Sequence, residues 1–199
     1  MAVRRLIDRI LEQPAVYAAW QAPFVSRKFA PVERHLSRHQ VRRVLDVGCG
    51  PGTNAPRFTG ADYVGIDNNE RYLAVARSRY RGTFIHADLA AADLSSLGTF
   101  DTILVNSFLH HLPDGAVSGI LRQLEPLLGS TGTAHLLELV LPDYRSIAWI
   151  MAKLDRGRYA RSLSAWRDLF EAHLDPISVE PYTFGGGLWS MVYFQGKAR

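Results

Sequence analysis

The sequence is poor in cysteine and lysine and has no long apolar run. Its single cysteine, Cys49, cannot form an internal disulfide, so the chain carries no mark of an oxidising compartment. No stretch approaches the roughly 20 apolar residues that a membrane-spanning helix needs. Nor does an apolar run follow the arginines near the start of the chain, as it would in a signal peptide. We therefore expect a cytoplasmic protein with no transmembrane segment.

The net charge of +4 comes almost entirely from arginine, because only three of the 23 basic residues are lysine. The arginines are spread along the chain, which is typical of a solvated surface rather than of a nucleic-acid-binding patch. We therefore do not expect nucleic acid as a partner. With 199 residues, of which 47% are hydrophobic, the chain is long enough for one domain with its own core.

Alternating glycines follow a short apolar strand in residues 44–52, VLDVGCGPG. These glycines cannot continue the strand, because they offer no side chain to pack and cost backbone entropy. They do allow a turn with positive φ, and they let a ligand lie close to bare backbone. Thr53 or Asn54 can then cap a following helix. In α/β sheets, a strand, a glycine turn and a helix start hold a nucleotide-like ligand at the carboxyl ends of the strands.

Further apolar stretches with polar ends follow in the chain. The stretches are 63–66, 83–87 and 100–106, and the polar residues that end them are Asp67, Asp88 and Asn106. In nucleotide-binding α/β folds, an acidic side chain at the end of the second strand accepts hydrogen bonds from the ribose hydroxyls. The stretch at 100–106 is apolar on both faces, which is typical of a buried strand in a parallel sheet.

The glycine stretch is one of several motifs in a fixed order. Its spacing is D-x-G-x-G-x-G from Asp46 to Gly52, which differs from the G-x-G-x-x-G of dinucleotide-binding folds. Together with the polar strand ends and the segment LHHLPD at 109–114, it resembles the class I S-adenosylmethionine (SAM) dependent methyltransferases over about residues 41–141. The resemblance implies SAM as the cofactor and S-adenosylhomocysteine (SAH) as the product.

The strand pattern and this resemblance predict an α/β fold, a Rossmann-like sheet of seven mostly parallel strands with helices on both faces. The fifth strand is expected at 133–139, after a turn at Gly129 and Gly132, and the last two at 177–179 and 188–194.

The same pattern predicts a single domain overall. Residues 1–40 are expected to form an N-terminal helical cap segment, with an amphipathic helix at 3–13, and 41–199 the SAM-binding domain. A helical insertion at about 142–175 follows the fifth strand. In the family, insertions at this place often build the substrate lid.

The resemblance also implies roles for individual residues. The expected cofactor-binding residues are Asp46, Gly48, Cys49, Gly50, Asp67, Asn68, Asp88, Leu89 and Asn106. Asp46 would anchor the methionine amino group, and Asp67 the ribose. Asp88 and the backbone of Leu89 would contact the adenine.

His110 is the candidate catalytic base. It matches the first histidine of the H-D-W-S-D segment in plant-type small-molecule O-methyltransferases, and an unperturbed histidine titrates near pH ~6.5. Alternatively, His110 and His111 both pack under the loop, and Glu138 is a weaker candidate for the base. Asp114 is expected to cap the next helix. No Cys/His cluster shows the spacing of metal ligands, so we expect no metal site.

The favoured function is methyl transfer to a small, partly hydrophobic or aromatic acceptor, with O-methylation favoured over N- or C-methylation. Aromatic residues in the insertion support this, among them Tyr144 and Trp149. An RNA or protein methyltransferase and a non-catalytic SAM-binding partner subunit stay open. An NAD-dependent oxidoreductase is disfavoured by the glycine spacing and by the lack of a Tyr-x-x-x-Lys pair. The sequence is consistent with a monomer or a homodimer.

Overall fold

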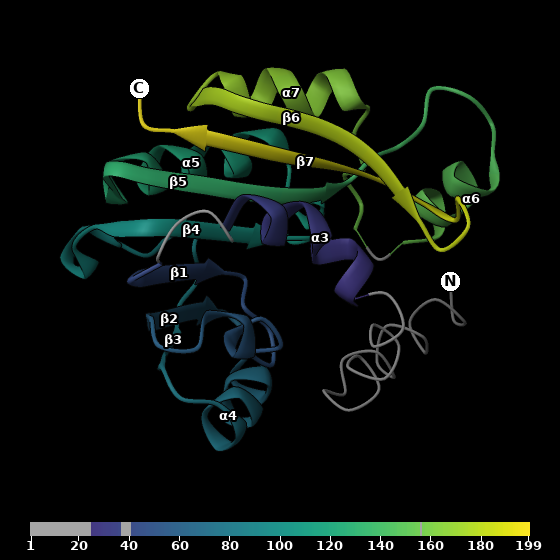
Figure 1. Ribbon diagram of the computed structural model, residues 1–199. Coiled ribbons are helices and arrows are strands. Elements are labelled where there is room, and N and C mark those ends of the chain that lie inside the picture. Colours follow the sequence, from purple (N-terminus) through teal and green to yellow (C-terminus); the bar gives the residue numbers. More distant parts are fainter. Residues whose placement is uncertain (1–24, 37–40, 156) are drawn as a thin grey trace.

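The computed structural model describes residues 25–36, 41–155 and 157–199 (Figure 1). The helix predicted at 3–13 lies outside the described residues. The division of the chain at residue 40 therefore stays a prediction.

A sheet of seven strands forms the centre of the fold. The strands are β1 (Arg43–Val47), β2 (Asp62–Asp67), β3 (Thr83–His86), β4 (Phe100–Asn106), β5 (Leu128–Leu139), β6 (Asp175–Phe184) and β7 (Trp189–Lys197). Their order is β3-β2-β1-β4-β5-β7-β6, with β7 antiparallel to both neighbours and the other pairs parallel. The predicted Rossmann-like, mostly parallel sheet is confirmed.

Helices cover both faces of this sheet. The α-helices are α3 (Val25–Leu36), α4 (Glu70–Arg79), α5 (Asp114–Leu124), α6 (Ile147–Leu154) and α7 (Leu163–Glu171). Short 3₁₀ helices occupy η1 (Ala55–Phe58), η2 (Ser95–Leu97), η3 (Leu109–His111) and η4 (Glu125–Leu127). Two helices, α6 and α7, lie between β5 and β6, in the region where the insertion is predicted.

The core consists of two layers, one on each side of the sheet. Side chains alternate along a strand, so Val44 of β1 packs with α3 and α4, whereas Leu45 and Val47 pack with α5 and α7. The large buried residues of the second layer include Trp166 and Phe170, which stack with ring centroids 5.2 Å apart. Burial on both faces explains the uninterrupted apolar run at residues 103–105 in the centre of β4.

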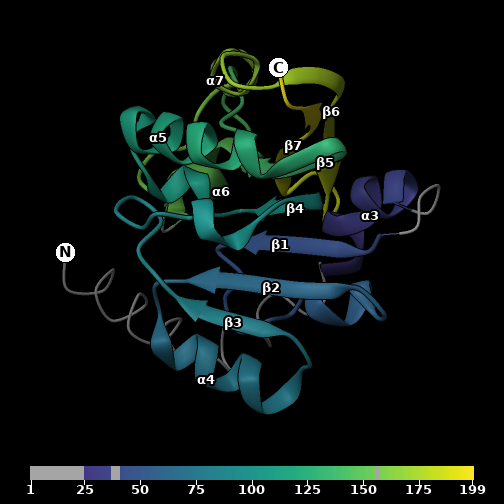
Figure 2. The same cartoon turned by 90° about the vertical axis from the view of Figure 1, so that its left-hand side faces the viewer.

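The carboxyl ends of β1, β2 and β4 meet at one edge of the sheet, because these strands are parallel. Helix α6 lies beyond this edge in both views of the ribbon (Figures 1 and 2). This edge therefore brings together the glycine turn, the polar strand ends and the insertion. Among the described helices, none combines the length and the hydrophobicity needed to cross a membrane.

Two local predictions were wrong. The fifth strand begins at Leu128 and not at residue 133, and the expected turn at Gly129 and Gly132 is an irregularity in its pairing with β4. The segment after the glycine turn is a single 3₁₀ turn, η1, and the Asn54 side chain makes no capping hydrogen bond to it. As the site shows, that side chain binds Asp46 instead.

Candidate active site

The glycine turn is folded back onto the end of β2. Gly48, Gly50 and Gly52 all have positive φ, which non-glycine residues rarely adopt. The amides of Gly48 and Cys49 both donate to the Ile66 carbonyl, at 2.8 and 3.0 Å. These two amides are thus already bonded, so the turn offers a ligand its bare backbone surface rather than these donors.

The side chain of Asp67, at the end of β2, binds the backbone of the same turn. Its carboxylate accepts from the Gly50 amide at 2.8 Å and from the Asn69 amide at 2.8 Å. Burial raises its pKa, and the two amide bonds oppose that shift. A carboxylate has about four acceptor positions, so these amides leave capacity for a ligand. The predicted role of Asp67 at the ribose is compatible with this geometry.

Asp46 is fully buried at the end of β1, beside the turn. Its Oδ2 accepts from the Tyr63 hydroxyl and, at 3.0 Å, from the Asn54 side-chain amide. Burial raises its pKa to about 6, although these two bonds lower it. The sequence did not single out Tyr63 or Asn54 as partners. Only the pairing of β1 with β2 and the short η1 turn bring them to Asp46.

Two buried oxygens at this edge lack a hydrogen-bond partner among the described residues. They are Oδ1 of Asp46 and Oδ1 of Asn106, and the Asn106 amide group is linked to Asn54 at 3.4 Å. Buried acceptors are normally satisfied, so such a pair marks a place for a donor. A Cβ added at Gly50 would meet no atom within 4 Å, so the turn is open there. Acceptors of this kind suit the ammonium group of a bound amino acid.

The other predicted cofactor residues lie along the β2 and β3 ends. Asp88 is exposed and binds the Ala90 amide at 3.0 Å, whereas Leu89 is buried in the core. Asn68 helps to line a groove of about 550 Å³ together with His86 and the start of α4. Cys49 is buried, and burial raises the pKa of its thiol, so the sulfur is protonated and unreactive.

Glu138 organises the opposite side of the edge, at the end of β5. Its buried carboxylate accepts from the amides of Phe108, Leu109 and His110 at 3.0, 2.7 and 3.4 Å. It also bonds the His110 Nδ1 at 2.7 Å. Burial raises the Glu138 pKa, but these partners outweigh burial and lower it overall. Glu138 thus holds the loop after β4 in place.

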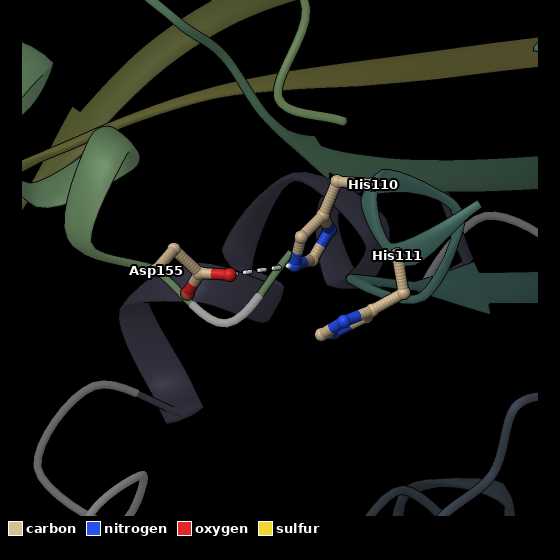
Figure 3. A group of neighbouring side chains, drawn as sticks. All are labelled: His110, His111 and Asp155. Carbon is tan, nitrogen blue, oxygen red and sulfur yellow. Dashed lines mark ion pairs between the residues drawn. The ribbon is translucent and has the colours of Figure 1, made fainter. Parts of the chain in front are cut away.

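His110 is enclosed between two carboxylates. Its Nδ1 faces Glu138, and its Nε2 lies 3.3 Å from Oδ2 of Asp155, just after α6 (Figure 3). Burial lowers its pKa, but both carboxylates raise it, and the result is about 9. In this arrangement both ring nitrogens have partners. His110 as a base stays a prediction, and it requires Nε2 to part from Asp155.

The insertion is attached to this loop at several points. The Tyr159 amide donates to the His110 carbonyl at 3.0 Å, and a Cβ added at Gly157 would collide with the His110 ring. Arg161 donates to the Leu112 carbonyl at 2.7 Å and to the Asp114 carboxylate at 2.6 Å. The expectation that Asp114 caps α5 was wrong, because it is the first residue of that helix and its carboxylate binds Arg161.

Lys28 of α3 approaches the same group of charges. Burial lowers the pKa of Lys28 to about 8, against the attraction of Glu138 and Asp155. The carbonyl of Lys28 accepts from the Tyr182 hydroxyl at 2.7 Å, which ties α3 to β6. An ammonium, an imidazole and two carboxylates therefore meet beside the loop after β4.

Comparison with known proteins finds similarity over the part of the chain that contains the glycine turn. Residues 44–132 match the family described as a methyltransferase domain. Trans-aconitate 2-methyltransferase of Acidovorax sp. is 30% identical over 183 residues, which are 85% of this chain and 64% of that protein. Residues 44–132 thus form a methyltransferase domain of the class I SAM-dependent type. The matched segment runs from β1 into β5 and contains the glycine turn, Asp67, Asp88 and the His110 loop.

Other relatives are similar to this chain over less of their length or only in fold. An uncharacterised methyltransferase of Mycobacterium tuberculosis is 34% identical over 111 residues, or 53% of this chain and 55% of that protein. The solved N-methyltransferase NodS of Bradyrhizobium japonicum, in complex with SAH, superposes with a TM-score of 0.71 at 14% identity. That match covers 87% of this chain and 86% of NodS. The chain thus spans roughly half to two thirds of the curated relatives it matches.

Proposed function

We propose that the protein is an active SAM-dependent methyltransferase that methylates a small, partly hydrophobic acceptor, on oxygen. The observation that carries the cofactor part is the pair of unpartnered buried oxygens, Asp46 Oδ1 and Asn106 Oδ1, beside an open glycine turn. SAM supplies an electrophilic methyl group on a sulfonium when bound. The protein must then hold the acceptor in line with that group and exclude water.

Each predicted residue has a role in this proposal. Asp46 and Asn106 accept hydrogen bonds from the methionine ammonium. Asp67 accepts from the ribose hydroxyls while it keeps the Gly50 amide, and so couples cofactor binding to the shape of the turn. Asp88 and Leu89 provide the contacts to the adenine. Gly48, Cys49 and Asn68 contribute backbone or surface contacts on either side.

The acceptor part rests on the insertion and on one relative. Exposed apolar side chains gather on and around α6, near the carboxyl ends of the strands, namely Tyr144, Ile147, Ile150, Leu154 and Tyr159. They suit an acceptor with an apolar portion. A relative named for trans-aconitate, a tricarboxylate, supports oxygen as the atom methylated. A carboxylate is ionised at neutral pH and needs no base, which suits a site where His110 is already held between two carboxylates.

Calorimetry with SAM and SAH, and with NADH as a control, tests the cofactor part. We expect micromolar binding of SAM and SAH and none of NADH. Binding of neither SAM nor SAH would refute the proposal.

An acceptor screen then tests the chemistry. SAH release would be measured with trans-aconitate, with an aromatic carboxylic acid and with a phenol. Turnover of a carboxylic acid that persists in His110→Gln would agree with a site that needs no base. Tight SAM binding without turnover of any acceptor would favour the alternative of a non-catalytic SAM-binding subunit.

A further inference from the structure

Three side chains from two distant parts of the chain meet beside the loop after β4. His110, His111 and Asp155 each place one possible ligand atom within 4.8 Å of the other two. Two of them come from η3, and the third comes from the loop after α6. Figure 3 shows the two imidazoles and the carboxylate converging on one space. Asp155 follows His111 by 44 residues, which explains why ligand spacing in the sequence gave no sign of this group.

We infer that His110, His111 and Asp155 form a binding site for a divalent transition-metal ion, with zinc as the best fit. Two imidazole nitrogens and one carboxylate are a ligand set that suits zinc and neighbouring metals. Three protein ligands also leave one position open, as in zinc sites that bind water or a substrate. This inference goes beyond the proposed methyl transfer and does not depend on it.

The distance between His110 and Asp155 supports this assignment. Nε2 and Oδ2 are 3.3 Å apart, longer than the 2.7–2.9 Å typical of a charged hydrogen bond. Ligands at about 2.0 Å from a tetrahedral metal lie about 3.3 Å from each other. The two atoms already have the separation of neighbouring ligands. His111 is exposed, and its ring centroid is 4.4 Å from that of His110, so a small rotation of its side chain completes the set.

Glu138 provides the support that such a site needs. A metal-binding histidine almost always uses its other ring nitrogen to bond a carboxylate or carbonyl, which fixes the tautomer. Here Glu138 bonds Nδ1 of His110 at 2.7 Å, which directs Nε2 toward Asp155. The close contact of Gly157 also fixes the ring of His110 against the insertion.

The charges that face the site are compatible with a cation. Glu138 and Asp155 are negative, and Lys28 is the ammonium that both carboxylates attract. Two carboxylates outnumber one ammonium, so the site is negative when the imidazoles are neutral. A metal ion must displace protons from these imidazoles, and binding is therefore best measured at alkaline pH.

The test uses the full chain without an affinity tag, titrated with Zn²⁺ by calorimetry and with Co²⁺ by visible absorption. We expect one ion per chain, with the visible bands of four- or five-coordinate Co²⁺. His111→Ala and Asp155→Asn should each weaken Zn²⁺ binding by about tenfold or more. His111 is exposed, so its removal should leave the fold and SAM affinity intact.

His173→Ala is the matched control, because His173 lies just after α7 near Arg122 and Glu125, away from this group. It should bind Zn²⁺ as the unchanged protein does. Absence of bound Zn²⁺ and Co²⁺ would overturn the inference. Equal loss of binding in His173→Ala, or full binding in both His111→Ala and Asp155→Asn, would also overturn it. SAM calorimetry on the same samples separates this outcome from a failure of the proposed methyl transfer.

Discussion

Two buried carboxylates lie near the carboxyl ends of β1 and β5, on either side of β4, and their hydrogen-bonding capacity is used to different degrees. Asp46, at the end of β1, keeps one oxygen without a partner among the described residues, and its pKa is raised to about 6. Glu138, at the end of β5, bonds three amides and an imidazole, and its pKa is lowered. A buried carboxylate thus lacks a hydrogen-bond partner for one oxygen on the side proposed for the cofactor, whereas both of its oxygens are hydrogen-bonded on the side of the insertion. Asp46 therefore has an acceptor oxygen available for a ligand, whereas the carboxylate of Glu138 is fully used in holding the loop after β4.

The largest effect should come from removing the carboxylate of Glu138. Glu138→Ala leaves the imidazolium of His110 and three amides without their shared acceptor. Breaking a buried pair in this way costs about 3–5 kcal/mol. The free energy of unfolding from urea titration measures it. Glu138→Gln keeps an acceptor oxygen for the amides and should cost clearly less, so an equal loss in both variants would contradict this account.

The buried carboxylate of Asp46 should instead make the free energy of unfolding depend on pH. The pKa of Asp46 rises from 3.8 to about 6 on folding, so its contribution is present in full below about pH 4 and is lost as the pH rises through 6. Above pH 6 the folded chain must carry a buried charge that the unfolded chain can hydrate. The shift corresponds to a loss of about 3 kcal/mol.

Urea unfolding at several pH values, on the unchanged protein and on Asp46→Asn, measures this loss. The variant lacks the titration, so relative to the unchanged protein it should gain about 3 kcal/mol of stability between pH 4 and pH 7. Asp62→Asn, at an exposed position of β2, is the control and should show no such gain. Parallel pH curves for the Asp46 variant would rule out this assignment.

A third substitution, at Asp67, tests the proposed cofactor side through the affinity for SAM. Asp67→Ala removes an acceptor for the proposed ribose contact and releases the Gly50 amide. Charged hydrogen bonds of this kind contribute about 1.5–3 kcal/mol, so SAM affinity should fall by roughly 10- to 100-fold. Calorimetry gives the affinity directly. Unchanged affinity would remove Asp67 from the cofactor site.

The smallest effect should follow from Asp88→Ala. Asp88 is exposed, and its carboxylate bonds only a neighbouring amide among the described residues. We expect a loss of about 0.5–1.5 kcal/mol in SAM affinity. Stability should change by no more than about 0.5 kcal/mol. A loss of SAM affinity as large as that of Asp67→Ala would mean that the adenine side dominates binding, contrary to the order proposed.

The strands and the glycine turn on the proposed cofactor side could be predicted from the sequence, because their signals are local. A glycine turn follows its own strand directly, and Asp67 and Asp88 end strands that can be recognised by their apolar residues. The order of the strands and the antiparallel β7 agree with this pattern. Even here the partners of Asp46 were missed, because Tyr63 and Asn54 reach it only through strand pairing and the shortened turn η1.

The insertion side could not be predicted in the same way, because its contacts join distant residues. Glu138 lies 28 residues from His110, and Arg161 lies 47 residues from Asp114. Pattern alone made Asp114 a helix cap and Glu138 a weak candidate for the base. In the structure, the Asp114 carboxylate binds Arg161, and the Glu138 carboxylate holds the loop after β4. Whether His110 serves as a base was open in the sequence and still depends on its contact with Asp155.

The first part of the insertion, which contains α6 but not α7, begins and ends at a narrow neck. Val140 pairs with Arg161, and the Leu141 amide donates to the Arg161 carbonyl at 2.7 Å. The chain between them leaves and rejoins the fold at one point, and doubling the length of such a loop costs only about 0.6 kcal/mol in closure entropy. The segment is therefore modular, because a longer or shorter version can be exchanged at this neck while the sheet stays unchanged.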